Sequence, residues 1–105
     1  MSEINGALSG LKIVACSTAQ AGTVPYMLMA DLGAEVIKIE TPGKGDNNRN
    51  SGFLEGEIGS FFETNNRGVK SLTLNLKSEN GQKILHSLIK DADVFGQNFR
   101  PGVAE

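Results

Sequence analysis

The sequence has a single cysteine, no tryptophan and only a small excess of negative charge. One cysteine, Cys16, cannot form an intramolecular disulfide, which excludes a disulfide-stabilised scaffold, and residues 1–10 show no signal-peptide pattern. The longest apolar run falls far short of the ~20 residues that cross a bilayer. The formal net charge of −2 implies no general attraction to nucleic acid or anionic membranes. We therefore expect a cytoplasmic protein in which any anion site is local.

Residues 8–40 have the pattern of a strand, a loop, a helix and a second strand. The apolar, β-branched run Lys12–Cys16 predicts a strand buried in a parallel sheet. Pro25 suits the first turn of a helix, and Gly33 suits the left-handed position that ends one. Residues 35–39 predict the second strand. The stretch is thus typical of a βαβ unit.

The second half of the chain predicts three more elements. Residues 72–76 alternate polar and apolar side chains, which indicates a strand with one buried face and leaves its direction open. Apolar residues recur at helical spacing in Glu79–Lys90, with Ser78 as N-cap and with Gly81 where a capping box has Glu or Gln. Val94–Gln97 predicts a further strand. Together these elements predict one Rossmann-like, three-layer α/β domain with a mainly parallel sheet.

Three loops are expected at one edge of this sheet. Because βαβ crossovers are right-handed, residues 17–22 and the segment after Glu40 should emerge at the same carboxyl edge. Residues 98–102 follow the strand Val94–Gln97 there. The stretch 41–59 is rich in glycine and asparagine, as is typical of long functional or mobile loops. Open α/β sheets bind ligands at this edge, so we expect the site there.

Several residues allow alternative interpretations. Glu40 ends the second strand 18 residues after Gly22, near the ~20-residue spacing of an acid that binds ribose, but the G-x-G-x-x-G motif is missing. NAD or FAD binding therefore remains as an alternative. Cys16 is expected to be a packed strand residue rather than a nucleophile, because His86, its one conceivable base, falls on the polar side of a helix. On local sequence alone, the favoured interpretation of Arg49 and Arg67 is that they are structural cations that pair with Asp46 or Glu63.

Four motifs occur in an order and spacing that resemble the amino-terminal part of the family III CoA-transferases. They are residues 30–40 with Pro42, Gly45, Asp46 and Arg49; the pair Asn66 and Arg67; residues 71–77; and residues 98–103, Asn-Phe-Arg-Pro-Gly-Val. That family includes formyl-CoA:oxalate, carnitine and bile-acid CoA-transferases and the related 2-methylacyl-CoA racemases. The resemblance implies that residues 1–105 are a partial N-terminal CoA-binding domain of a longer, interlocked homodimer.

The resemblance also implies a coenzyme A nucleotide site along the carboxyl edge, without a metal. Asn98 and Phe99 would contact the nucleotide, Leu74 would supply an apolar wall, and cations would face the phosphates. A glutamine amide near the thioester could donate to a developing oxyanion. The residues so implied are Gln20, Ala21, Lys70, Leu74, Asn98, Phe99 and Arg100.

In the family, the catalytic residues lie beyond the segment that this sequence resembles. Transferases use an Asp nucleophile there and racemases an acid/base pair, so no catalytic residue is assigned here. The resemblance implies transfer of CoA between an acyl-CoA and a carboxylate acceptor, with a racemase, a dinucleotide-binding domain and a non-binding remnant as alternatives. We expect the 105 residues alone to have no transferase or racemase activity and to be marginally stable.

Overall fold

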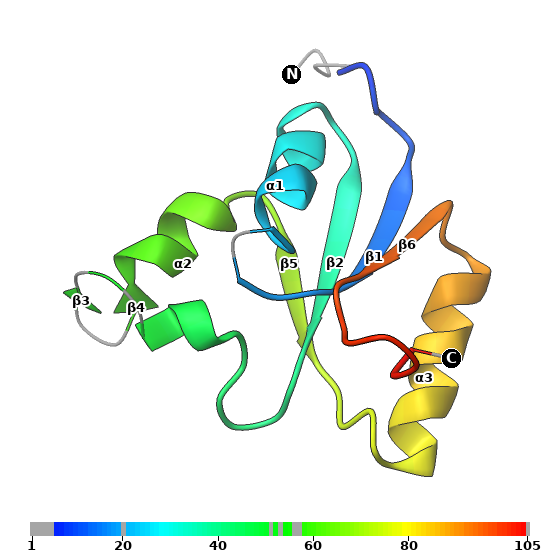
Figure 1. Ribbon diagram of the computed structural model, residues 1–105. Coiled ribbons are helices and arrows are strands. Elements are labelled where there is room, and N and C mark those ends of the chain that lie inside the picture. The colour runs from blue at the N-terminus through cyan, green and yellow to red at the C-terminus, as the bar shows by residue number, and fades with distance from the viewer. Residues whose placement is uncertain (1–5, 20, 51, 53, 56–57, 105) are drawn as a thin grey trace.

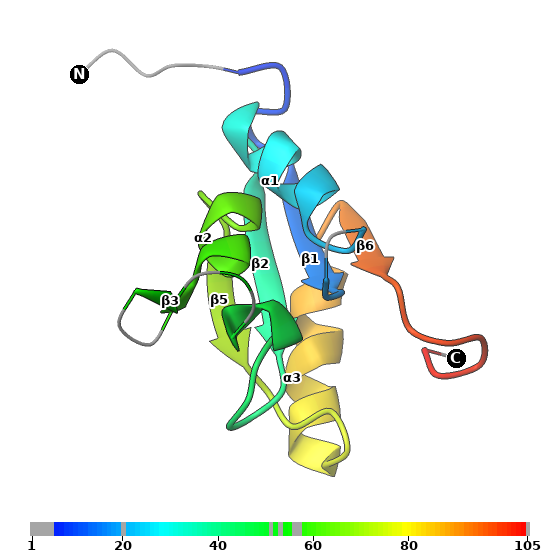
Figure 2. The same ribbon diagram turned by 60° about the vertical axis from the view of Figure 1, so that its left-hand side comes forward.

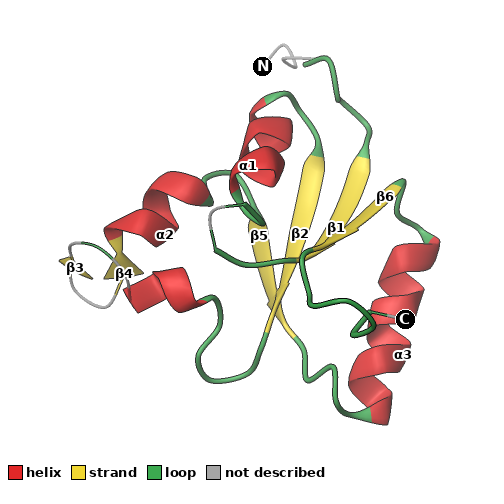
Figure 3. Ribbon diagram, in the orientation of Figure 1, coloured by secondary structure: helices red, strands yellow, loops and turns green. Residues whose placement is uncertain are grey.

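The structure of the chain is a computed structural model that describes residues 6–19, 21–50, 52, 54–55 and 58–104. Among these residues, four strands form a parallel sheet in the order β5-β2-β1-β6 (Figures 1 and 3). The elements of this sheet and its connections are β1 Lys12–Cys16, α1 Val24–Asp31, β2 Glu35–Glu40, β5 Lys70–Thr73, α3 Glu79–Lys90 and β6 Val94–Gln97. The α/β fold with a mainly parallel sheet is thus confirmed.

Strand β1 lies between β2 and β6. Ile13 pairs with Val36 on one side and with Val94 on the other, and both pairings are parallel. This confirms the βαβ unit. The fourth strand differs from the prediction: it is Lys70–Thr73, not residues 72–76, and it pairs in parallel with β2 at an edge of the sheet.

Two helices cover opposite faces of the sheet. Alternate strand residues Ile13 and Val36 form a cluster that packs against side chains of α1, among them Met29. The neighbours Val14 and Ile39 point to the other face, where they form a second cluster with α3. The two clusters place the sheet between two helical layers, and Figure 2 shows α1 and α3 from a second direction. Side chains buried on both faces explain the continuous apolar run of β1, whereas the edge strands β5 and β6 are mostly exposed.

The helix ends follow from local sequence. Ser78 caps α3, because its Oγ accepts a hydrogen bond from the N–H of Gly81 at 3.0 Å. A Cβ at Gly81 would lie well inside van der Waals contact of the carbonyl oxygen of Asn75, which explains why no capping-box side chain stands there. Gly33, with φ of 105°, follows α1 and ends it as predicted.

The stretch between β2 and β5 contains more regular structure than predicted. It holds a 3-10 turn η1 (Asn47–Asn50), two short antiparallel strands β3 (Leu54–Glu55) and β4 (Ile58–Gly59), and a six-residue helix α2 (Ser60–Asn65). Six residues are too few for a helical period to be recognised in the sequence. Among the described residues, no helix is both long and apolar enough to cross a bilayer.

Candidate functional site

The loops after β1 and β6 meet at the carboxyl edge of the sheet, as predicted. The side-chain amide of Asn98 forms two hydrogen bonds with the backbone of Thr18: Oδ1 accepts from N–H at 3.1 Å, and Nδ2 donates to C=O at 2.9 Å. A Cβ at Gly22 would lie 2.7 Å from Asn98 Nδ2, so glycine is needed for this close approach. Asn98 therefore joins the loops that follow the neighbouring strands β1 and β6, at the edge where open α/β sheets generally bind ligands.

The loop after β2 reaches the same place. Asp46 Oδ1 accepts hydrogen bonds from the N–H of Ala19 at 3.4 Å and of Asn48 at 2.9 Å. Ala19 has φ of 62°, and its carbonyl accepts from Thr23 Oγ1 at 2.5 Å. The β1–α1 loop is thus held from one side by the loop after β2 and from the other by the start of α1.

Asp46 also forms a buried ion pair. Its side chain is fully buried, and Oδ2 contacts Nζ of Lys38, whose side chain is 4% exposed. Lys38 Nζ donates in addition to Asn66 Oδ1 at 2.9 Å and lies 5.3 Å from the centre of the Phe62 ring. A buried lysine needs such partners, because an unpaired charge in the interior is costly.

Glu40, the last residue of β2, is the centre of a second network. Its Oε1 accepts from the N–H of Asp46 at 2.9 Å and from Nε of Arg49 at 2.8 Å, and its Oε2 accepts from Arg49 Nη2 at 2.6 Å and from the hydroxyl of Ser71. Burial alone would raise the pKa of Glu40, but the hydrogen bonds from Arg49, Ser71 and the Asp46 N–H outweigh it and lower the pKa to about 2. Both carboxylate oxygens are occupied, which does not favour a ribose-binding role for Glu40.

The predicted ion-pair partners of the two arginines are wrong. Arg49 pairs with Glu40 rather than Asp46, and its guanidinium lies 3.9 Å from the centre of the Phe62 ring. Arg67 pairs with Asp31 on α1 at 2.7 Å rather than with Glu63. Both arginines are structural cations, as expected, but the folded course of the loops selects carboxylates that are distant in sequence.

A pocket of about 230 Å³ opens beside the Glu40 network, at the carboxyl ends of β2 and β5. Its lining is mainly polar and includes Thr41, Lys44, Ser71 and Thr73. The Lys44 side chain has no ion pair among the residues that the structure describes. This pocket offers a cation and hydroxyl groups to a ligand at the predicted edge.

The structure brings some of the predicted site residues together. Asn98, Phe99 and Arg100 follow β6, and Ala21 lies in the β1–α1 loop to which Asn98 is bonded. Phe99 is 37% exposed, and both Arg100 and Ala21 are exposed. Gln20 lies outside the described residues. Four of the seven predicted residues thus share the carboxyl edge.

Two of the predicted residues lie elsewhere or are occupied. Lys70 begins β5, and its Nζ pairs at 3.3 Å with Glu35, the first residue of β2, so it points toward the amino edge. Leu74 is 8% exposed and belongs to the core cluster under α3 together with Val14 and Ile39. Its backbone N–H donates to the Glu40 carbonyl at 3.0 Å, and Leu74 does not line the pocket beside Glu40.

Sequence reasoning assigned no role to Lys38 and did not predict the buried pair with Asp46. A signal was present, because a lysine in the middle of the apolar strand Glu35–Glu40 must either be exposed or find a buried partner. Cys16 is 2% exposed, and burial raises its pKa to about 11, so it is a packed thiol. His86 is exposed on α3, as predicted.

Comparison with known proteins matches this architecture. Residues 8–105 match the profile of CoA-transferase family III. The acetyl-CoA:oxalate CoA-transferase of Acetobacter aceti is 39% identical over 100 residues, covering 95% of this chain and 26% of that protein. The human succinyl-CoA:glutarate CoA-transferase is 41% identical over 97 residues, covering 90% of this chain and 22% of that protein.

A solved structure agrees with the sequence comparison. A CAIB/BAIF family protein from Brucella suis has a TM-score of 0.87 and 36% identity over 94% of this chain and 27% of its own. The chain spans about a quarter of the length of the curated relatives that it matches. Because the family profile covers nearly all of its residues, the chain belongs to CoA-transferase family III.

Proposed function

We propose that this chain carries part of the coenzyme A nucleotide site of an enzyme that moves CoA between an acyl-CoA and a carboxylate acceptor. Family membership supports the reaction class, and two relatives are named for CoA transfer to oxalate and glutarate. The enzyme is proposed to act in the cytoplasm as a homodimer. A dinucleotide such as NAD is the competing ligand, since the sheet topology alone suits both.

The observation that carries the proposal is the distribution of unpaired cations. The described part of the chain has five ion pairs, which engage Lys38, Arg49, Arg67, Lys70 and Lys83. Five basic residues have no carboxylate partner there. Three of them, Lys44, Lys77 and Arg100, follow the carboxyl ends of β2, β5 and β6, whereas Lys12 begins β1 and Lys90 ends α3. Coenzyme A carries a 3′-phosphate and a pyrophosphate, so its site requires cations that other groups do not neutralise.

The same edge offers a surface for the adenine ring. Phe99 is more than a third exposed, although a phenylalanine would normally be buried in a core. Its N–H donates to Gln97 Oε1 at 2.7 Å, which fixes the backbone at the start of the tail that also carries Arg100. We propose that Phe99 packs against the nucleotide while Lys44 and Arg100 face phosphate groups. Lys70 is not included, because Glu35 holds it at the opposite edge.

The first experiment identifies the ligand. The 105-residue chain is titrated with CoA, dephospho-CoA, NAD and FAD, and the unfolding temperature is recorded at each concentration. We expect CoA to stabilise the protein most, dephospho-CoA less because it lacks the 3′-phosphate, and both effects to weaken at high salt. Stabilisation by NAD or FAD in preference to CoA would contradict the proposal.

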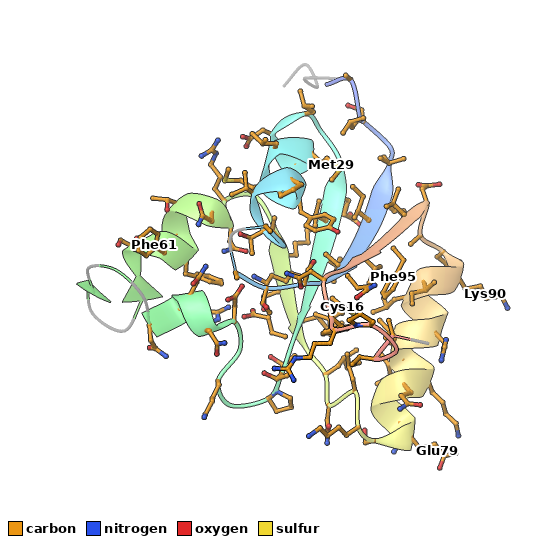
Figure 4. All side chains as sticks on the ribbon, in the orientation of Figure 1. Cys16, Met29, Phe61, Glu79, Lys90 and Phe95 are labelled. Carbon is orange, nitrogen blue, oxygen red and sulfur yellow. The ribbon has the colours of Figure 1, made fainter. Side chains whose placement is uncertain are left out.

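The second experiment locates the site. Lys44→Ala, Arg100→Ala and Phe99→Ala are each expected to weaken CoA binding by about 1 kcal/mol or more, roughly five- to tenfold, in isothermal titration calorimetry. The matched controls are Lys90→Ala and Phe61→Ala. Both control side chains are exposed; Lys90 is the last residue of α3, and Phe61 lies on α2 (Figure 4). Equal losses in variants and controls would place the ligand elsewhere.

A further inference from the structure

Ala19, in the β1–α1 loop, has a backbone conformation that an alanine does not favour. Ala19 has φ of 62°, in the left-handed region where an alanine is strained, and it is exposed at the carboxyl edge. Its N–H is held by Asp46 Oδ1 and its C=O by Thr23 Oγ1. Strained residues persist where their surroundings over-determine them, and they cluster at ligand sites. The structure thus fixes this peptide from both sides.

The Asp46 carboxylate, which accepts the hydrogen bond from the Ala19 N–H, is held in place at a cost in desolvation free energy. Asp46 is fully buried and Lys38 is 3% exposed, so both charges have lost their hydration. A buried ion pair is weak evidence for stability, because desolvation offsets the attraction, and apolar side chains of similar volume often serve as well. Apolar side chains would, however, provide no acceptor for Ala19. The pair is therefore better explained by what Asp46 holds than by its own energy.

Lys38 gives Asp46 a rigid support. It lies on β2, two residues before the strand ends, and its Nζ is also bonded to Asn66 Oδ1. The backbone of Asp46 is fixed separately, because its N–H donates to Glu40. The Asp46 carboxylate is thus held by Lys38 from the strand and by the Asn48 N–H from its own loop, and its Oδ1 also reaches the β1–α1 loop.

We propose that Asp46, held by Lys38, is a positioning residue for the acyl-CoA site: it keeps Ala19 in the left-handed conformation in which the β1–α1 loop meets the ligand. The inference rests on the proposed function. Neither side chain touches the ligand, because both are buried. Their effect is on pre-organisation, since a loop that is already ordered loses less freedom on binding.

Two charge-balanced double variants separate positioning from stability. Lys38→Met with Asp46→Asn removes both charges and retains an Oδ1 acceptor for Ala19. Lys38→Met with Asp46→Leu removes the same charges and the acceptor as well. We expect the first to bind CoA within about threefold of the unmodified chain and the second to lose tenfold or more, in calorimetry under conditions where both are folded.

Hydrogen exchange gives a readout that needs no ligand. We expect the Ala19 amide to exchange slowly in the unmodified chain and in the Asn-containing variant, and rapidly in the Leu-containing variant, while the unfolding midpoints of the two variants stay similar. Equal CoA affinity of the two double variants would overturn the inference and leave the proposed function intact. Absence of CoA binding by the unmodified chain would overturn both.

If either double variant fails to fold, a single variant tests whether the fixed Ala19 peptide affects CoA binding. Thr23→Val retains the shape of the side chain and the ion pair but removes the hydroxyl that donates to the Ala19 carbonyl. We expect its CoA affinity to fall about threefold or more, with slower association, because the Ala19 peptide is then held at its N–H but no longer at its carbonyl. Affinity equal to that of the unmodified chain would refute the role of the fixed Ala19 peptide.

Discussion

Replacing Glu40 with glutamine should remove a defined part of the pH dependence of stability. The pKa of Glu40 is about 2 in the folded chain against an ordinary value of 4.5. Because the folded-state pKa is depressed, the stabilisation is fully present above pH 4.5 and is lost as the pH falls toward 2. The difference of about 2.5 pH units corresponds to roughly 3 kcal/mol at 1.36 kcal/mol per unit.

The geometry supports a somewhat smaller stabilisation by the ionised Glu40 side chain. The Glu40 side chain is 2% exposed, but that of Arg49 is 33% exposed, and solvent screens an ion pair that it reaches. We therefore expect about 2 kcal/mol from this group. The Glu40→Gln variant retains the size of the side chain and one oxygen acceptor, while it loses the charge whose protonation causes the pH dependence.

Urea denaturation at several pH values between 7 and 2.5 measures the effect. We expect the free energy of unfolding of the unmodified chain to fall more steeply below pH 4.5 than that of Glu40→Gln. Glu63→Gln, which removes an exposed carboxylate on α2, serves as the matched control and should leave the slope unchanged. Parallel profiles for Glu40→Gln and the unmodified chain, or a Glu40 pKa near 4.5 in an NMR titration, would refute the reasoning.

Three further predictions concern packing. Gly81→Ala should lower the unfolding temperature although alanine is favoured by ~1 kcal/mol inside helices, because its Cβ would collide with the Asn75 carbonyl; a higher temperature would contradict this. Gly96→Ala should lower the free energy of unfolding by about 1–3 kcal/mol in urea denaturation, because its Cβ would collide with the Tyr26 hydroxyl and ring. Adding Tyr26→Ala to the same chain should recover part of this loss, and a Gly96→Ala variant of unchanged stability would contradict the clash. Cys16 should react with a thiol reagent at pH 8 only after denaturation, because burial raises its pKa to about 11; rapid labelling of the folded chain would show that the strand end is open.

Three of the four strands of the parallel sheet were predictable from sequence: the two central strands and the edge strand β6. Lys12–Cys16 and Val94–Gln97 have the predicted bounds, and β2 is longer than predicted by one residue. Strand β5 was placed two residues too far along, because its leucines alternate on one face beyond the end of the sheet. Thr73 pairs with Glu40, where β2 ends, so the partner strand sets the limit of β5. Local sequence does not contain that information.

The candidate site was predictable in position but not in its internal contacts. The β1–α1 loop and Asn98 were placed at one edge because each follows the carboxyl end of a predicted strand, and their two hydrogen bonds confirm it. The pairing of Arg49 with Glu40, and of Lys38 with Asp46, depends on the path of the loop after β2. Several carboxylates near each cation in the sequence were equally suitable, so only the folded chain could select among them.

The Asn98–Thr18 contact has a consequence for the order in which the chain folds. It joins residues 80 apart, whereas β1 and β2, which pair on the other side of β1, both lie within residues 12–40. During synthesis from the amino terminus, the β1–β2 pairing and α1 can form first from a short segment. The second side of β1 stays open until the last strand closes a loop of nearly the whole chain, an entropic cost that grows with loop length. The ligand edge should therefore be among the last parts of the domain to form.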